Sequence, residues 1–194
     1  MKKLLLFLII EFFLSSCTEK LPVVDDPGNA QYNLVDQNNR KVVFPELVKG
    51  KLVVMNYIFT NCPDICPLST NNMRLIQERI KKEKINHIEF VSVSFDPLQD
   101  SPEVLRKFAG IRNLDLSNWT FLTGEKPMID SLMRKIGIVA VIGDSTVFKD
   151  GRKIYYYIHT DRIQLMDEDG KIRKNYKGSS INVDEILADV KSLQ

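Results

Sequence analysis

The fold is decided by residues 51–67, which read KLVVMNYIFTNCPDICP. The first nine favour β-structure and are apolar on both faces except at Asn56, as expected of a central strand that is covered on both sides. Cys62 and Cys66 follow, and Pro67 suits the first position of a helix in which apolar residues recur at helical spacing. We therefore expect a buried strand, a loop with two thiols and an amphipathic helix.

The segments outside this stretch alternate between strand-like and helix-like patterns. We expect strands at 87–95 and 119–122, and a hairpin over 32–44 around the turn residues 36–39. We expect helices at 101–108, 125–136 and 183–193, a second hairpin at 159–176, and irregular structure at 139–157. This order predicts an α/β protein, a thioredoxin-like sandwich with an added N-terminal β-hairpin and an insertion before the last hairpin.

Residues 1–16 have the layout of an export signal. Lys2 and Lys3 precede an apolar run that is shorter than the roughly 20 residues of a membrane span. Cys17 directly follows two serines and resembles the cysteine of a bacterial lipobox, which implies cleavage before Cys17 and a lipid anchor there. A plain signal peptide or an uncleaved anchor is the alternative. We expect a protein of the bacterial cell envelope, held at a membrane with its domain outside the cytoplasm, on the periplasmic side.

The rest of the chain predicts a linker and one domain. Residues 17–30 contain two prolines, one glycine and several acids, which favours a linker after the lipidated cysteine. Residues 31–194 suit a single domain with one sizeable core. The 27 Lys and Arg and the 25 Asp and Glu are interspersed, so the sequence lacks the basic footprint of a nucleic-acid-binding protein.

The two thiols of the loop can bind a soft metal or exchange electrons. Free backbone amides at a helix start favour negative charge, so we expect both Cys62 and Cys66, the latter near the N-cap, to be biased towards the thiolate. Three residues separate them. Such a loop lets two thiolates face one ion and still permits a disulfide when the metal is absent. A structural disulfide of an exported protein is the alternative.

A histidine adds to this pair. The chain has two histidines: His87 opens a strand, whereas His159 precedes the last hairpin. In a thioredoxin-like fold that part of the chain faces the cysteine loop. Two thiolates and one imidazole form a soft site suited to copper, as Cu(I) or, with a further weak ligand, as Cu(II). Zinc would normally require a fourth strong ligand, and the sequence offers no evident one.

Several segments resemble the SCO/SenC family of copper chaperones. Residues 58–67 are similar to the family's segment FTxCPxxCP, which follows a core strand. Residues 91–103 and 119–124 resemble its next strand, helix start and short third strand. His159 falls where the family carries its metal histidine, and residues 165–171 resemble the hairpin that follows.

The resemblance implies a function and a ligand set. It implies delivery of copper to the dinuclear copper centre of a cytochrome c oxidase, or maintenance of that centre's cysteines in reduced form. Cys62 and Cys66 would be thiolate ligands that also form a reversible, redox-active disulfide, and His159 would be the third ligand of one copper ion per chain. The implied partners are the copper-bearing oxidase subunit or another copper-site protein, and a thioredoxin-like reductant. One departure is Thr160-Asp161 after His159, where the family has Ser or Thr and then an apolar residue.

Other interpretations stay open at this stage. A thiol-disulfide oxidoreductase of the envelope would use Cys62 and Cys66 without His159. A copper sensor would use the same three ligands, and a peroxiredoxin-like peroxidase would share only the scaffold. Asp96, at the end of a strand, could tune the thiols by its charge or simply form a turn. The tyrosines at 155–157 could stiffen the chain, form a docking surface or pack.

Overall fold

The structure, a computed structural model, describes residues 21–151 and 153–194. The signal expected at 1–16 and the lipidation expected at Cys17 lie outside these residues. Among the helices of the described ranges, none combines the length and the apolar composition needed to cross a bilayer.

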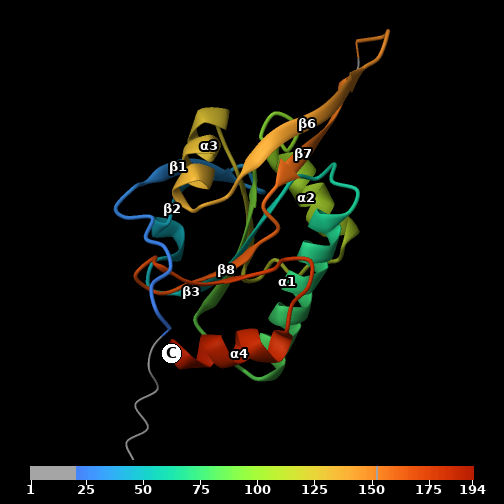
Figure 1. Cartoon of the computed structure of the whole chain (residues 1–194). Helices are drawn as coiled ribbons and strands as arrows, with labels where there is room; N and C mark the ends of the chain where they lie inside the picture. The colour runs from blue at the N-terminus through green and yellow to red at the C-terminus, as the bar shows by residue number, and fades with distance from the viewer. Residues whose placement is uncertain (1–20, 152) are drawn as a thin grey trace, which may run out of the picture.

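Nine strands and four α-helices make up the described chain (Figure 1). The strands are β1 (Tyr32–Asp36), β2 (Lys41–Phe44), β3 (Leu52–Ile58), β4 (Ile88–Ser94), β5 (Trp119–Thr123), β6 (Ala140–Val147), β7 (Lys153–His159), β8 (Ile163–Met166) and β9 (Ile172–Tyr176). The helices are α1 (Ile65–Lys82), α2 (Pro102–Ile111), α3 (Lys126–Lys135) and α4 (Val183–Ser192), with a short 3-10 helix at Glu46–Val48.

Seven strands form one sheet in the order β2-β1-β5-β4-β3-β8-β9. The strands β3, β4 and β5 run parallel, and α1 and α2 supply the crossovers that parallel neighbours require. Every residue of β3 is buried, which confirms the prediction of a central strand covered on both sides. The expected N-terminal hairpin is present as β1–β2.

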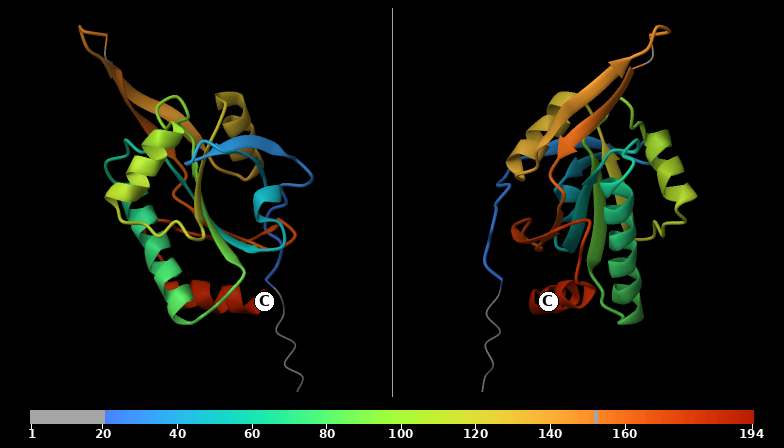
Figure 2. Two further views of the ribbon diagram at one scale, coloured as in Figure 1. Left: turned by 180° about the vertical axis from the view of Figure 1, so that it is seen from behind. Right: turned by 45° about the vertical axis from the view of Figure 1, so that its right-hand side comes forward.

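Helices cover both faces of this sheet. Helix α1 packs on β3, α2 on β5, α3 on β1, and α4 against α1. Figure 2 shows α3 on the opposite side of the sheet from α1 and α2. The described chain begins beside the C-terminus, at the end of the molecule opposite to the projecting hairpin β6–β7 (Figure 1).

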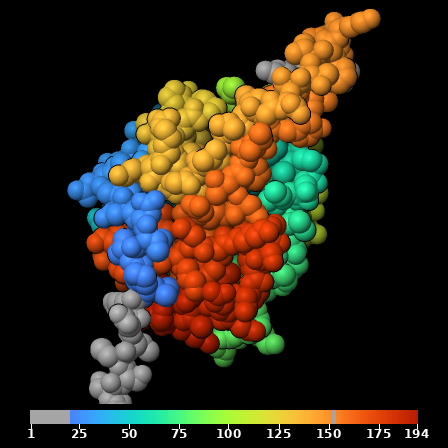
Figure 3. Space-filling model, in the orientation of Figure 1, coloured from blue at the N-terminus to red at the C-terminus, as the bar shows by residue number. Residues whose placement is uncertain are grey.

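The prediction of irregular structure at 139–157 was wrong. These residues form most of the antiparallel hairpin β6–β7, which stands out from the body in the space-filling view (Figure 3). A bulge between Ile142 and Ser145 interrupts its register. Because both faces of β6 are largely exposed, its sequence lacks the alternation that marks a half-buried strand. His159 is the last residue of β7 and, as predicted, precedes the final hairpin, which is formed by β8 and β9 and begins at Ile163 rather than at residue 159.

Candidate metal centre

The two cysteines lie where β3 ends and α1 begins. The helix starts at Ile65 with Asp64 as its N-cap, two residues before the expected start, so Cys66 lies in the first turn rather than at the cap. Pro67 is tolerated there because first-turn amides have no partner within the helix. The amide of Cys66 is one of these free donors, and it donates to Cys62 Sγ over 3.4 Å. The first turn of α1 thus holds the sulfur of Cys62 close to the backbone of Cys66.

The sheet brings His159 to the same place. Strand β8 runs antiparallel to β3, and Ile163 at its beginning pairs with Asn56 near the end of β3. The residues just before β8 therefore lie at the edge of the sheet where β3 delivers the cysteine loop. His159 Nε2 lies 3.8 Å from Cys66 Sγ. Ligand atoms of Cys62, Cys66 and His159 all lie within 4.8 Å of one another, so the structure brings the three predicted residues together.

The two thiols differ in charge, contrary to the expectation that both are biased towards the thiolate. A hydrogen bond from the Cys66 thiol lowers the pKa of Cys62 to about 4 against the opposing effect of burial, and His159 and the backbone amides add to the lowering. The same hydrogen bond, together with burial, raises the pKa of Cys66. Cys62 is half-buried and Cys66 fully buried. The metal-free pair therefore favours a thiolate at Cys62 and a thiol at Cys66.

The ring of His159 is oriented for ligation through Nε2. Its Nδ1 lies 3.2 Å from the backbone carbonyl oxygen of Thr160, an acceptor only, so Nδ1 carries the proton of the neutral ring. Nε2 then points its lone pair towards the thiols. Burial disfavours the charged ring, but the thiolate of Cys62 and the carbonyl of Thr160 outweigh it and raise the pKa of His159. Thr160 and Asp161 differ from the residues expected after the histidine, but the ring keeps this orientation because the backbone carbonyl of Thr160 provides it.

Aromatic rings fix the imidazole from the side of the sheet. The ring of Phe95 lies 5.0 Å from that of His159, and Phe59 meets it edge-on at 6.1 Å. Tyr157 packs against the same two phenylalanines, at 5.2 Å from Phe59 and 5.0 Å from Phe95. The three donors therefore sit beside an apolar wall that excludes water from one side.

Asp100 is a supporting residue that the sequence did not reveal. It is fully buried, and its carboxylate accepts hydrogen bonds from the amide of Thr60 at 3.0 Å, from the Thr60 hydroxyl and from Ser94 Oγ at 2.6 Å. It thus ties the start of the cysteine loop to the end of β4. In the sequence Asp100 simply precedes Ser101, the N-cap of α2, and nothing distinguished it from a residue at the start of a helix.

Asp96 lies under the hairpin β6–β7. The residue is 1% exposed, and its carboxylate accepts hydrogen bonds from the hydroxyls of Tyr155 and Tyr157. Burial raises the pKa of Asp96, and the two tyrosine hydrogen bonds partly offset the effect. Two of the three tyrosines that the sequence singled out therefore contact the carboxylate whose role it left open.

The donor set is soft and compact. Bond lengths of roughly 2.3 Å to sulfur and 2.0 Å to nitrogen, as for zinc, place the three ligand atoms of a trigonal site about 4 Å from one another. The three donors thus need little movement to share an ion. Within the described residues no fourth His, Cys, Asp or Glu joins this group. Two sulfurs and one nitrogen without a strong oxygen ligand are the composition of a site for a soft metal.

The chain matches the SCO1/SenC family over residues 24–194. It is 32% identical to the SCO1 protein homolog of Bacillus subtilis over 188 residues, which make up 95% of this chain and 92% of that protein.

Solved structures of similar proteins cover most of both chains. BsSco, described as a member of the Sco family of cytochrome c oxidase assembly proteins with a disulfide switch, has a TM-score of 0.72 and 30% identity over 90% of this chain and 98% of its own. A SCO1/SenC family lipoprotein from Bacillus anthracis has a TM-score of 0.71 and 31% identity, covering 84% and 93%. Bradyrhizobium japonicum ScoI with copper bound has a TM-score of 0.70 and 25% identity, covering 85% and 98%. These matches confirm the predicted thioredoxin-like sandwich with its N-terminal hairpin and its insertion before the last hairpin, and the chain belongs to the SCO1/SenC family.

Proposed function

We propose that this protein binds one copper ion through Cys62, Cys66 and His159 and delivers it to the dinuclear copper centre of a cytochrome c oxidase. The observation that carries the proposal is the meeting of two thiols and an imidazole nitrogen within 4.8 Å. A family relationship to oxidase assembly proteins supports the choice of recipient.

The donor set favours copper over zinc. Cu(I) is stable with two or three soft ligands, whereas a structural zinc site is almost always closed by four. Cys62, Cys66 and His159 offer three. The relative from Bradyrhizobium japonicum that was solved with copper supports the same assignment.

The asymmetry of the thiols suits loading and release. Cys62 is already a thiolate and half-buried, so it can meet an incoming ion first. Cys66 must lose its proton to become the second ligand, so binding releases a proton and weakens as the pH falls. Cys62 lies in the loop just before α1 and is half-buried as a residue, so a recipient's ligands can approach this side of the site.

The proposed location is the cell envelope, with a lipid anchor at Cys17. The signal-like residues 1–16 and the serines before Cys17 support it, and the Bacillus anthracis relative is a lipoprotein. The described chain starts at the end of the molecule opposite to the hairpin that bears His159 (Figure 1). An anchor on that end would leave the metal centre facing away from the membrane.

A second candidate is thiol-disulfide exchange, which the charge of Cys62 favours. A Cys62 thiolate can attack a partner's disulfide, forming a mixed disulfide and releasing one partner thiolate. Cys66, once deprotonated, then displaces the second partner thiol and closes a Cys62–Cys66 disulfide, so two electrons pass to the partner. This reaction would keep the cysteines of an oxidase copper centre reduced, and it does not need His159.

Replacement of His159 separates the two candidates. In cells grown with limiting copper, His159→Ala should abolish oxidase activity if the protein delivers copper, and added copper should restore it. His87→Asn is the matched control: His87 is the other histidine, its φ is 59°, and asparagine tolerates that left-handed conformation. Full oxidase activity in His159→Ala at limiting copper would refute delivery and favour thiol-disulfide exchange.

A further inference from the structure

The pairing of β6 with β7 alone does little to fix the position of the hairpin that ends in His159. Strands β6 and β7 form a separate two-stranded sheet in the described structure. Their outward side chains are well exposed, with Val141, Tyr156 and Ile158 at 51%, 50% and 68%. A two-stranded ribbon is marginally stable alone, so the position of its last residue depends on how the ribbon is attached to the body.

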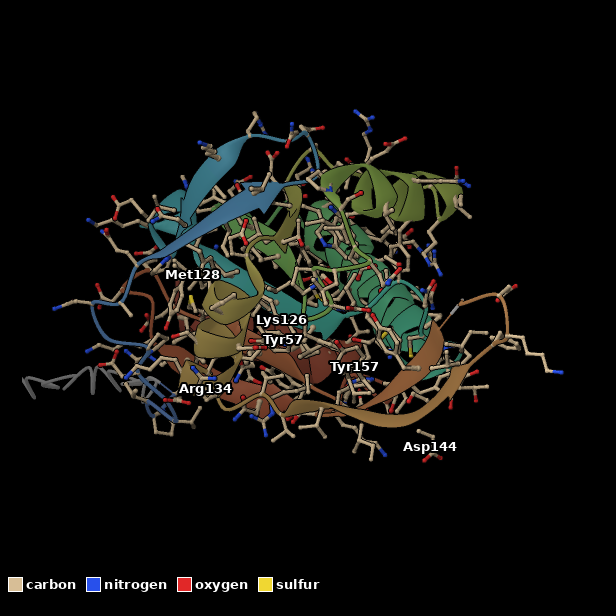
Figure 4. All side chains as sticks on the ribbon, turned by 90° about the horizontal axis from the view of Figure 1, so that it is seen from above. Tyr57, Lys126, Met128, Arg134, Asp144 and Tyr157 are labelled. Atoms are coloured by element: carbon tan, nitrogen blue, oxygen red, sulfur yellow. The ribbon has the colours of Figure 1, made fainter. Side chains whose placement is uncertain are left out.

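Side chains on the inner face of β7 make that attachment. Because successive residues of a strand point to opposite faces, Tyr155, Tyr157 and His159 share one face and Tyr156 lies on the other. The hydroxyl of Tyr155 donates to the carboxylate of Asp96 at 2.8 Å, and that of Tyr157 donates at 3.3 Å. Figure 4 shows Tyr157 between the hairpin and the body, whereas Asp144 of the same hairpin points outward.

Asp96 is itself held rigidly. Its amide donates to Ser94 Oγ at 3.1 Å, and its carbonyl accepts the amides of Gln99 and Asp100 at 3.1 and 2.9 Å. Ser94 Oγ in turn donates to Asp100, which binds Thr60 at the start of the cysteine loop. One hydrogen-bonded frame at the end of β4 therefore carries both the hairpin and the cysteine loop.

We propose that Asp96, Tyr155 and Tyr157 form a latch that sets the position of His159 relative to the two thiols. Asp96 is then a positioning residue, acting through the tyrosines on the histidine, and its charge is not the operative property. The latch itself is inferred from the contacts of the hairpin with Asp96. Its effect on copper binding rests on the proposed function.

Paired substitutions separate the latch from an effect of charge. Tyr155→Phe/Tyr157→Phe keeps the carboxylate and both rings but removes the two donors. Asp96→Asn removes the charge but keeps an oxygen that accepts from the tyrosines. Tyr156→Phe removes an exposed hydroxyl from the outer face of the same strand and is the matched control.

Copper binding by the mature full-length protein in detergent is the first readout. The double tyrosine variant should bind Cu(I) roughly 10- to 100-fold more weakly, the loss expected when a partner that orients a metal ligand is removed. Its Cu(II) form should lose the nitrogen hyperfine signature of His159 in electron paramagnetic resonance. Asp96→Asn and Tyr156→Phe should retain both properties. Wild-type affinity and signature in the double variant, or loss of both in Asp96→Asn alone, would overturn the latch.

Hydrogen exchange of the metal-free protein tests the latch even if copper is not its cargo. The backbone amides of residues 153–159 should exchange about tenfold faster in the double variant, since their attachment to the body is weakened. Tyr156→Phe should leave the rates unchanged. Absence of copper binding in the wild type would refute the proposed function, whereas unchanged exchange in the double variant would refute the latch.

Discussion

Cys66 and His159 are 93 residues apart in the chain, yet Cys66 Sγ and His159 Nε2 lie 3.8 Å apart. Cys66 lies in the first turn of α1, just after the end of β3. The antiparallel pairing of β8 with β3 places His159, shortly before β8, at the same edge of the sheet. No local segment holds both groups. The complete donor set therefore exists only in the folded protein, and metal binding must be linked to folding.

The linkage predicts a stabilisation by copper. At a free Cu(I) concentration 100 times the Kd, the free energy of unfolding should rise by about 2.7 kcal/mol, or less if the unfolded thiols also bind. Urea denaturation of the reduced protein with and without Cu(I) measures it. Cys62→Ser/Cys66→Ser is the control that should show no increase, and an equal increase in that variant would place the copper elsewhere.

The lowered pKa of Cys62 predicts its reactivity. With a pKa of about 4, Cys62 is a thiolate at every pH above that value, so its alkylation rate should be nearly flat between about pH 6 and pH 8. An ordinary thiol, with a pKa of about 8.5, would react roughly tenfold faster for each unit of pH in that interval. Peptide mass analysis after brief treatment of metal-free protein with iodoacetamide should find the label on Cys62 and not on Cys66. A tenfold rise per pH unit at Cys62 would contradict this assignment.

The same pair should form an intramolecular disulfide when copper is absent. Cys62 supplies the attacking thiolate, and an oxidising envelope favours the product. The oxidised protein should take up no copper until a reductant is added, because ligation needs both thiolates. Protein isolated without metal under oxidising conditions should show no free thiol at either position, and two alkylated thiols there would count against the prediction.

Asp100 should matter for stability as well as for the loop. Asp100→Ala leaves the amide and hydroxyl of Thr60 and the hydroxyl of Ser94 without their buried acceptor, which should cost about 1–3 kcal/mol of unfolding free energy. Asp100→Asn keeps one acceptor oxygen and should lose less. Urea denaturation of the two metal-free variants would show it, and equal stability of Asp100→Ala and wild type would contradict the role given to this carboxylate.

The sequence predicted the parts of the structure that depend on burial. Residues 51–59 read as a central strand because both of their faces meet the core, and the two cysteines and His159 stood out by chemical type. The hairpin β6–β7 escaped because its faces meet solvent, so burial imposed no pattern on it. The inequality of the two thiols escaped for another reason: it arises from one hydrogen bond between them, which spacing alone does not fix.

X-ray absorption at the copper edge tests the central claim most directly. The reduced wild-type protein loaded with one equivalent of Cu(I) should show a first coordination shell of two sulfurs and one imidazole nitrogen. His159→Ala should keep the sulfurs and lose the imidazole, whereas His87→Asn should match the wild type. A wild-type spectrum without imidazole, or one that His159→Ala leaves unchanged, would contradict the assignment of Cys62, Cys66 and His159 as the copper site.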